Sequence, residues 1–135
     1  MQIDGRCHCG NVTYRAEVDP ASVVICHCTD CQTMASAPFR TTVFCNETDF
    51  RLLGEAPTIY VKVAESGRQR QQAFCDKCGT HIYATTVEAP GSRTLGLRVG
   101  AIAQRDQLIP KRQLWARSAQ PWVAHLDELQ SVQTQ

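Results

Sequence analysis

The amino-acid sequence predicts a mainly β protein, and three observations support this fold class. Stretches rich in β-branched and aromatic residues recur along the chain. Glycine, proline and small polar residues separate these stretches at short intervals. No alternation of strands with long helical patterns appears, which argues against a parallel, doubly wound sheet. We therefore expect short strands joined by turns.

Five stretches carry the strand signal. Residues 12–18 alternate apolar side chains with polar neighbours, which is the period of two that a half-buried strand requires. The other four are β-branched and aromatic, and they cover residues 39–44, 58–63, 81–87 and 94–102. Turns are expected between the strands, at residues 19–20, 54–57, 65–67, 89–92 and 110.

Two short helices are expected in addition. The first covers residues 29–36, where Thr29 or Asp30 is suited to cap the amino end. The second covers residues 121–129, where apolar residues recur at three-residue spacing. The predicted architecture is thus mainly β with one or two short helices.

Length and charge narrow the class of protein. A chain of 135 residues fits one domain, residues 1–135. Its 14 Lys and Arg residues nearly cancel its 13 Asp and Glu residues, so neither nucleic acid nor a membrane surface is expected as a partner. The first ten residues lack the pattern of a secretory signal, and no apolar stretch approaches the ~20 residues that span a bilayer. A cytoplasmic location is expected.

The chain contains eight cysteines, which is unusual for a protein of the reducing cytosol. Clustered cysteines in that compartment point to metal binding. A secreted disulfide scaffold is the alternative, but it leaves the tight C-x-C and C-x-x-C spacings unexplained. We therefore interpret the cysteines as metal ligands.

The tripeptide Cys-His-Cys occurs twice, at residues 7–9 and 26–28. On an extended strand, alternate side chains share a face, so the two cysteines of each tripeptide would point together and the histidine away. His8 and His27 are therefore expected to pack or to support the site rather than to bind the metal.

Four cysteines are expected to form a structural zinc site. Two thiolates do not complete a tetrahedral zinc shell, so Cys7 and Cys9 need two further ligands. The C-x-x-C sequence at Cys75 and Cys78 supplies them, and Gly79 is free to adopt the positive φ that closes such a turn. Four thiolates from two remote segments would make a closed site that stabilises the fold.

The remaining cluster, Cys26, Cys28 and Cys31, brings three thiolates from one short segment. Three protein ligands and one open position are the arrangement of catalytic zinc. The amino end of the expected helix carries a partial positive charge, which would favour the ionised form of these three thiols. The sequence thus predicts a second, reactive zinc and a total of two zinc ions per chain.

Spacing alone permits another grouping, in which Cys7 and Cys9 join Cys28 and Cys31, and Cys26 joins the C-x-x-C pair. Cys45 is isolated in the sequence, and we expect it to be a small buried thiol of the core. If it instead reached the Cys26 cluster, it would close the second site.

Three segments in order resemble the glutathione-dependent formaldehyde-activating (GFA) enzyme family: "GRCHCGNVTY", "CHCTDCQTMASAPF" and "FCDKCGTHIY". The resemblance runs from Gly5 to about Leu126. It implies a β-tent fold of antiparallel sheets held by zinc, and it favours the four-plus-three grouping of the cysteines. It also implies a carbon–sulfur lyase or synthase, similar to S-(hydroxymethyl)glutathione synthase, that acts on a small thiol such as glutathione and a small aldehyde such as formaldehyde.

Two positions depart from the family pattern. Ser36 stands where the family usually has glycine, and Gln113 stands where histidine is common. Two alternative functions remain open from the sequence. One is a non-enzymatic zinc module that binds a protein partner, and the other is a thiol redox sensor that releases zinc on oxidation.

Overall fold

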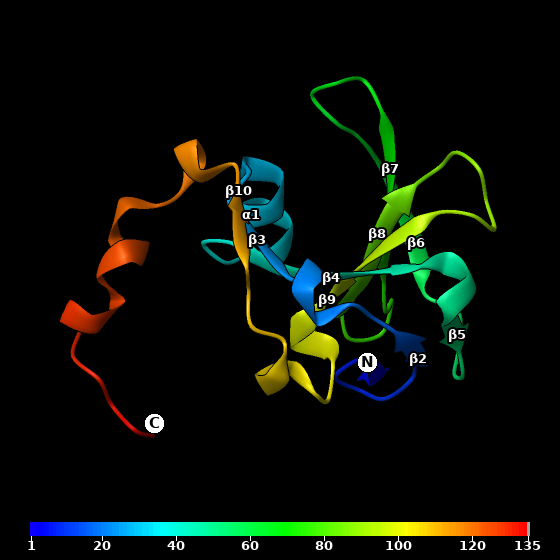
Figure 1. Cartoon of the computed structure of the whole chain (residues 1–135), viewed down its shortest axis with the longest axis horizontal. Coiled ribbons are helices and arrows are strands. Elements are labelled where there is room, and N and C mark those ends of the chain that lie inside the picture. Colours follow the sequence, from blue (N-terminus) through cyan, green and yellow to red (C-terminus); the bar gives the residue numbers. More distant parts are fainter. Residues whose placement is uncertain (135) are drawn as a thin grey trace.

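The protein is described by a computed structural model that covers residues 1–134 and contains two β-sheets (Figure 1). The smaller sheet has three strands in the order β1-β2-β5, and the larger has seven in the order β10-β3-β4-β9-β8-β7-β6. The mainly β fold class is therefore confirmed. One strand pair departs from the expected antiparallel arrangement, because β10 runs parallel to β3. Gln135, the last residue of the expected domain, lies outside the described residues.

The elements have the following bounds. The smaller sheet consists of β1 (Gln2–Arg6), β2 (Thr13–Glu17) and β5 (Phe50–Leu52). The larger sheet consists of β3 (Val24–Cys26), β4 (Arg40–Asn46), β6 (Thr58–Val63), β7 (Gln69–Phe74), β8 (His81–Thr86), β9 (Thr94–Arg98) and β10 (Arg112–Leu114). The α-helix is α1 (Thr29–Ala35). Short 3-10 segments are η1 (Pro20–Ser22), η2 (Glu47–Asp49), η3 (Val99–Ala101), η4 (Arg105–Gln107), η5 (Ala116–Ser118) and η6 (Pro121–Glu128).

Each of the five predicted strand stretches contains a strand, namely β2, β4, β6, β8 and β9. The stretch 94–102 was predicted too long, because the strand ends at Arg98 and η3 follows. The sequence pattern did not predict β1, β3, β5, β7 or β10. The sequence of β7, QRQQAF, lacks β-branched residues, but its place between β6 and β8 supplies ladder hydrogen bonds on both sides.

The helix expected at residues 29–36 is confirmed as α1, with one correction at its start. Its N-cap is Cys28, whose Sγ accepts a hydrogen bond from the backbone N of Cys31 at 3.3 Å, rather than Thr29 or Asp30. The expected C-terminal helix is instead the 3-10 segment η6, with a non-helical backbone at His125. Short helices are marginal without tertiary packing, and the side chain of Leu126 in η6 remains 50% exposed.

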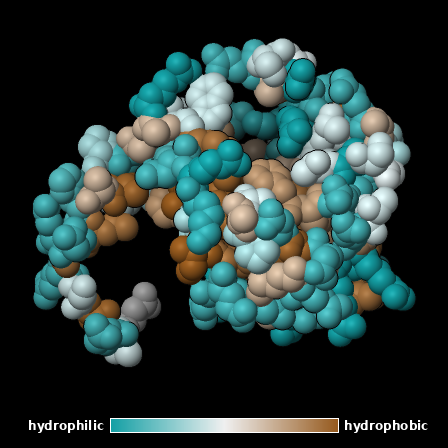
Figure 2. Space-filling model, in the orientation of Figure 1, coloured by the Kyte–Doolittle hydropathy of each residue, from teal (hydrophilic) through white to brown (hydrophobic). Residues whose placement is uncertain are grey.

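The C-terminal segment extends away from the two sheets (Figure 1). Hydrophobic side chains lie along it where it leaves the body (Figure 2). Its exposed apolar residues are Trp122, Leu126, Leu129 and Val132. Within the described residues, no helix is long and apolar enough to cross a membrane.

The hydrophobic core joins the smaller sheet to one face of the larger one. Ile3 and Tyr14 of the smaller sheet and Leu97 of the larger are almost wholly buried in the same cluster. The ring of Tyr14 crosses its antiparallel partner Gly5 so closely that a Cβ on Gly5 would lie 1.9 Å from the ring. Glycine is therefore required at that position.

The two faces of the larger sheet have different roles. On β4, Val43 and Cys45 point into the core, and the alternate residues Thr42 and Phe44 line a cavity on the other face. Cys26 of β3 lies opposite Arg40 in the antiparallel register, so it shares the cavity face of β4. The core and the candidate site thus lie on opposite faces of the same strands.

Candidate metal centres

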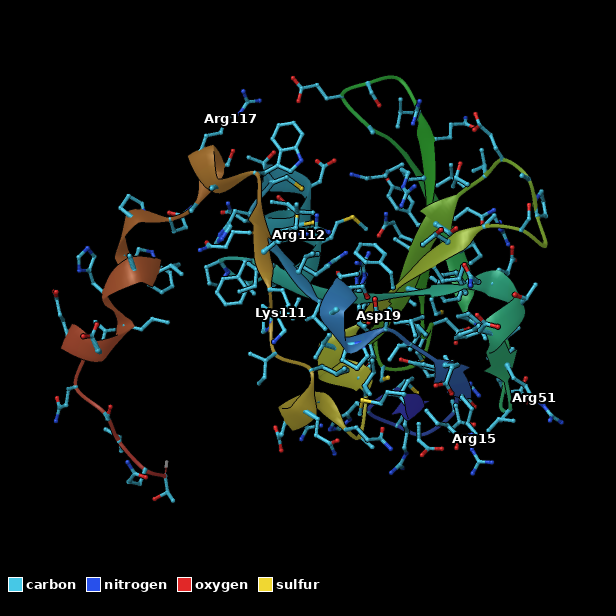
Figure 3. All side chains as sticks on the ribbon, viewed as in Figure 1. Arg15, Asp19, Arg51, Lys111, Arg112 and Arg117 are labelled. Carbon is cyan, nitrogen blue, oxygen red and sulfur yellow. The ribbon has the colours of Figure 1, made fainter. Side chains whose placement is uncertain are left out.

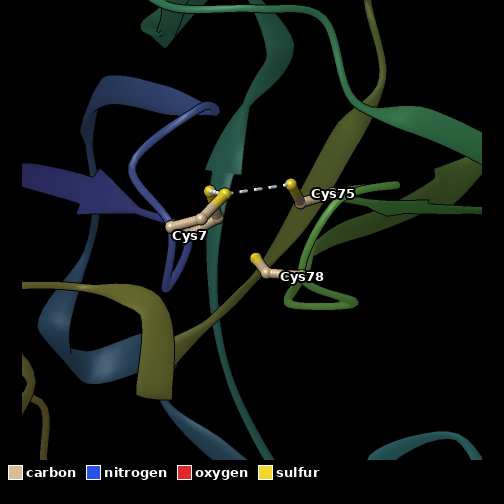
Figure 4. Close-up of side chains that lie close together, drawn as sticks. Cys7, Cys75 and Cys78 are labelled. Atoms are coloured by element: carbon tan, nitrogen blue, oxygen red, sulfur yellow. Dashed lines mark hydrogen bonds between the residues drawn. The ribbon is translucent and has the colours of Figure 1, made fainter.

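Four cysteine sulfurs from remote segments converge in one cluster, and Figure 4 shows Cys7, Cys75 and Cys78 of this group. Cys7 and Cys9 come from the turn that follows β1, and Cys75 and Cys78 come from the turn between β7 and β8. All four sulfurs lie within 4.8 Å of one another. The four-cysteine cluster therefore connects the smaller sheet to the larger one.

Backbone turns aim these sulfurs. Gly79 has a φ of 73°, and its N donates to the carbonyl of Cys75 at 2.8 Å, which closes the C-x-x-C turn. At the other segment, Cys7 to Gly10 form a turn rather than the extended strand that the sequence argument assumed. The sulfurs of Cys7 and Cys9 nevertheless lie 3.6 Å apart, because the turn brings them together.

The spacing of the sulfurs fits a tetrahedral zinc ion. Zinc–thiolate bonds of ~2.3 Å place neighbouring sulfurs of a tetrahedron ~3.8 Å apart. The Cys7–Cys9 pair measures 3.6 Å and the Cys9–Cys75 pair 3.7 Å between Sγ atoms. The cluster could therefore hold a metal ion without a change of backbone.

A second cluster consists of Cys26, Cys28 and Cys31, whose sulfurs also lie within 4.8 Å of one another. Cys26 ends β3, Cys28 caps α1, and Cys31 lies in the first turn of that helix. The structure thus groups the seven sulfurs as four and three, and it does not bring Cys7 and Cys9 to Cys28 and Cys31.

The thiols of this three-cysteine cluster influence one another. The contact with the Cys31 thiol lowers the pKa of Cys26 to about 5. The same contact, together with burial, raises the pKa of Cys31. The thiol of Cys26 therefore ionises readily, and its negative charge then opposes ionisation of the Cys31 thiol, because like charges repel. A divalent cation would stabilise all three as thiolates, so the cluster is also suited to a metal ion.

The histidines lie apart from both clusters. His8 is exposed, and its backbone N donates to Thr80 Oγ1 at 3.1 Å. His27 is 1% exposed, and its Nε2 donates to Oε1 of Gln113 at 2.8 Å. Neither ring belongs to a group of potential ligands among the described residues. Sequence reasoning identified Gln113 only as a departure from a family pattern, without its partner.

Cys45 lies on the core face of β4, opposite Leu95 in the β4–β9 register. It is 7% exposed, and burial raises its pKa to about 11. The prediction that Cys45 is a core thiol is confirmed. Its side chain points to the opposite face of the sheet from the three-cysteine cluster, so it does not complete that site.

A cavity of about 760 Å³ adjoins the three-cysteine cluster. That volume lies in the range of small-molecule sites, roughly 300 to 1,000 Å³. Its floor is the cavity face of the larger sheet, and its sides are α1, the end of the β6–β7 hairpin and the segment after β10. Cys26, Cys28 and Cys31 all line it. A ligand in this cavity could therefore reach the cluster.

Several cationic side chains surround the cavity. Arg70 and Arg98 line its floor, and Lys62 lines its side in a salt bridge with Asp30. Arg117 lies in the segment after β10 (Figure 3). Its guanidinium carbon lies over the ring of Trp115, 4.9 Å from the ring centroid. No local motif in the sequence marks Lys62, Trp115 or Arg117, because these side chains reach the cavity only through the tertiary fold.

Comparisons with known proteins agree with this geometry. The family model described as "Glutathione-dependent formaldehyde-activating enzyme" matches residues 2–118. A crystal structure of a Rhodobacter sphaeroides protein is similar with a TM-score of 0.61 at 20% identity, and the match covers 84% of this chain and 99% of that one. At this identity the likeness shows the fold alone. A search of curated proteins found no match.

Proposed function

The chain belongs to the glutathione-dependent formaldehyde-activating enzyme family, and from that premise we propose that it is a zinc-dependent enzyme that joins a small thiol to a small aldehyde. The observation that carries the proposal is the three-cysteine cluster in the wall of an open cavity. Glutathione and formaldehyde are the proposed substrates, and S-(hydroxymethyl)glutathione is the proposed product. The enzyme would belong to the carbon–sulfur lyases and act in the cytoplasm.

Two zinc ions are proposed, with different roles. Cys7, Cys9, Cys75 and Cys78 would hold a structural ion, because four thiolates leave no position for a substrate. Cys26, Cys28 and Cys31 would hold the reactive ion, whose role is to keep a bound thiol in its thiolate form at neutral pH. The cavity supports this division, since it reaches only the second cluster.

The reaction forms one carbon–sulfur bond. The substrate sulfur attacks the aldehyde carbon, the carbonyl π-bond electrons move to the oxygen, and the proton lost by the thiol returns to that oxygen through solvent. His27 does not serve as the donor in this proposal, because its ring lies outside the cavity lining and its Nε2 hydrogen is bound to Gln113. The open cavity admits the water that carries the proton.

The carboxylates of glutathione would find cations at the cavity. Arg70 on the floor and Arg117 at the mouth are the proposed partners, because Lys62 is already paired with Asp30. Two other arginines are less suited: Arg68 lies in the exposed β6–β7 turn, and Arg40 lines a separate cavity.

Cobalt substitution tests the proposal. Cobalt-loaded protein should show a stronger sulfur-to-metal charge-transfer band when a thiol enters the fourth position of the three-cysteine site. Cys45→Ala should respond like the wild type, because Cys45 lies in the core. The bound thiol should also consume formaldehyde faster than the same thiol in buffer, and Cys28→Ser should abolish that advantage.

The opposite result has a defined meaning. A second site that is fully loaded with cobalt but does not respond to thiols, in the wild type and in Cys45→Ala alike, contradicts the enzyme proposal. The chain would then be better described as a zinc module whose two ions are both structural.

A further inference from the structure

Two arginines lie close together without a carboxylate partner, where the cavity beside the three-cysteine cluster adjoins a second cavity that both arginines line. Arg40 is 5% exposed, and Arg98 lines the cavity floor. Arg40 Nη1 and Arg98 Nη2 both donate to Oε1 of Gln72, at 3.4 Å and 3.0 Å, and Arg98 Nη1 donates to Thr42 Oγ1 at 3.0 Å. Among the described residues, no acidic group lies within salt-bridge distance of either guanidinium.

The guanidinium groups of Arg40 and Arg98 each have a buried nitrogen without a hydrogen-bond partner among residues 1–134. Arg40 Nη2 and Arg98 Nε are buried and have no hydrogen-bond partner in the described part of the chain. Arg93 shows the contrast, because its guanidinium is paired with the carboxylate of Glu47. Buried cations are expected to be paired with negative charge, so the Arg40–Arg98 pair lacks a counter-charge within the protein's carboxylates.

The three-cysteine cluster lies next to this pair. Cys26 is directly opposite Arg40 in the β3–β4 register, and Thr42, which Arg98 contacts, is two residues further along the same face of β4. Burial lowers the pKa of Arg40, and the charges of Cys31, Cys28 and Cys26 oppose that shift. Burial lowers the pKa of Arg98 only to about 9, so its guanidinium remains charged at neutral pH.

The charges can be counted. Three thiolates around a divalent cation leave one net negative charge, and a fourth thiolate leaves two. Two guanidinium groups carry two positive charges. The pair and the metal site are therefore neutral together only when a thiolate occupies the fourth position.

We propose that Arg40 and Arg98 form the counter-charge of the three-cysteine metal site and select an anionic sulfur, over a neutral ligand, as the fourth ligand. The inference rests on the proposed function, because it requires the open position. Binding releases the proton of the incoming thiol to solvent. Gln72 holds the two guanidiniums side by side despite their repulsion, and His81, whose pKa is lowered by burial and by both arginines, adds no third charge.

The test compares a thiol with a neutral ligand on the cobalt-loaded full-length protein. 2-Mercaptoethanol has no carboxylate, so only its sulfur brings negative charge, and imidazole brings none. Each is titrated against the visible cobalt spectrum in the wild type, Arg98→Met, Arg98→Lys and Arg40→Met. Methionine keeps bulk and removes charge, a change that buried sites often tolerate. Arg51→Met is the control, because Arg51 is exposed on β5 at a distant edge (Figure 3).

Both methionine variants should raise the Kd for 2-mercaptoethanol at least ~10-fold, because a lost charge at an effective dielectric constant of ~20 has that order of effect. The Kd for imidazole should change by less than ~3-fold, and Arg98→Lys and Arg51→Met should resemble the wild type. Equal weakening of both ligands, or no change in either, would overturn the proposal. A second comparison applies if Arg98→Met fails to bind cobalt at the three-cysteine site. In that case, an Arg98→Lys protein that still binds this cobalt supports the requirement for a positive charge. An Arg98→Lys protein that also fails to bind it contradicts the requirement.

The two proposals fail in different ways. If the cobalt spectrum of the wild-type protein does not change on addition of 2-mercaptoethanol, both the enzyme proposal and this inference are overturned. A wild-type site that binds the thiol with the same preference over imidazole in every variant overturns the inference alone.

Discussion

His27 Nε2 and Gln113 Oε1 form a 2.8 Å hydrogen bond that ties the three-cysteine segment to β10. His27 directly follows Cys26, and Gln113 lies opposite Ile25 in the parallel β10–β3 register. The imidazole is 1% exposed and packs edge-on to Phe39 with 5.7 Å between ring centroids. The repeated histidine thus supports the position of the cysteines on either side of it.

Gln113→Leu should lower the free energy of unfolding by about 1 to 3 kcal/mol, because it leaves the buried Nε2 hydrogen of His27 without an acceptor. Urea unfolding of the metal-loaded protein measures the change. The double variant His27→Phe with Gln113→Leu removes both polar partners and should lose less stability than Gln113→Leu alone. A double variant that is less stable than the single one would contradict this account.

Loss of a ligand should affect the two clusters differently. Cys75→Ser should unfold the protein, because the four-cysteine cluster joins two sheets and structural zinc contributes roughly 10 to 16 kcal/mol in small peptides. Cys28→Ser should lose the second metal and stay folded, since its ligands are local and serine is a good N-cap for α1. Metal content and circular dichroism distinguish the two outcomes. Folded Cys75→Ser protein with full zinc content would refute the structural assignment.

Ser36→Gly should raise stability by about 0.5 to 1 kcal/mol. Ser36 ends α1 with a φ of 49°, and the N atoms of Ser36 and Ala37 donate to the carbonyls of Thr33 and Gln32. This is a Schellman motif, whose left-handed residue is usually glycine. Thr33→Gly, at an exposed position inside the same helix, should instead lower stability by a few tenths of a kcal/mol. Thermal melts with a common sign for both variants would argue against this explanation.

The Glu47–Arg93 ion pair should make stability depend on acid pH. Side-chain hydrogen bonds from Arg93 lower the pKa of Glu47 from 4.5 to about 2. The folded pKa lies below the unfolded one, so the pair stabilises the fold above pH ~4.5 and this contribution is lost as the pH falls toward ~2. The stability difference between wild type and Glu47→Gln should therefore shrink over that interval. Metal loss affects both proteins alike, so a difference that stays constant would contradict the prediction.

The sequence by itself determined the mainly β class and the candidate cysteine ligands, while their spacing left two groupings open and the tertiary structure brought the sulfurs together as four and three. Alternation along residues 12–18 is a local signal, and so is the C-x-x-C turn closed by Gly79, so both can be recognised without knowledge of distant contacts. Cys45 was expected in the core as an isolated small thiol, and alternation along β4 places its side chain there together with that of Val43. These features depend on neighbours that are close in the chain.

The tertiary structure alone decided the pairing of remote side chains. Strand β10 has three residues, and its parallel register against β3 brings Gln113 to His27 across 86 positions of the chain. In the sequence, Arg40 and Arg98 look like ordinary surface residues. Only the pairing of β4 with β9 brings their side chains together, since Thr42, two residues from Arg40, lies opposite Arg98. The proposed preference of the three-cysteine site for an anionic ligand depends on this pairing of remote strands. The strength of an electrostatic interaction is set by the distance between the charges and by their burial, and not by their separation along the chain.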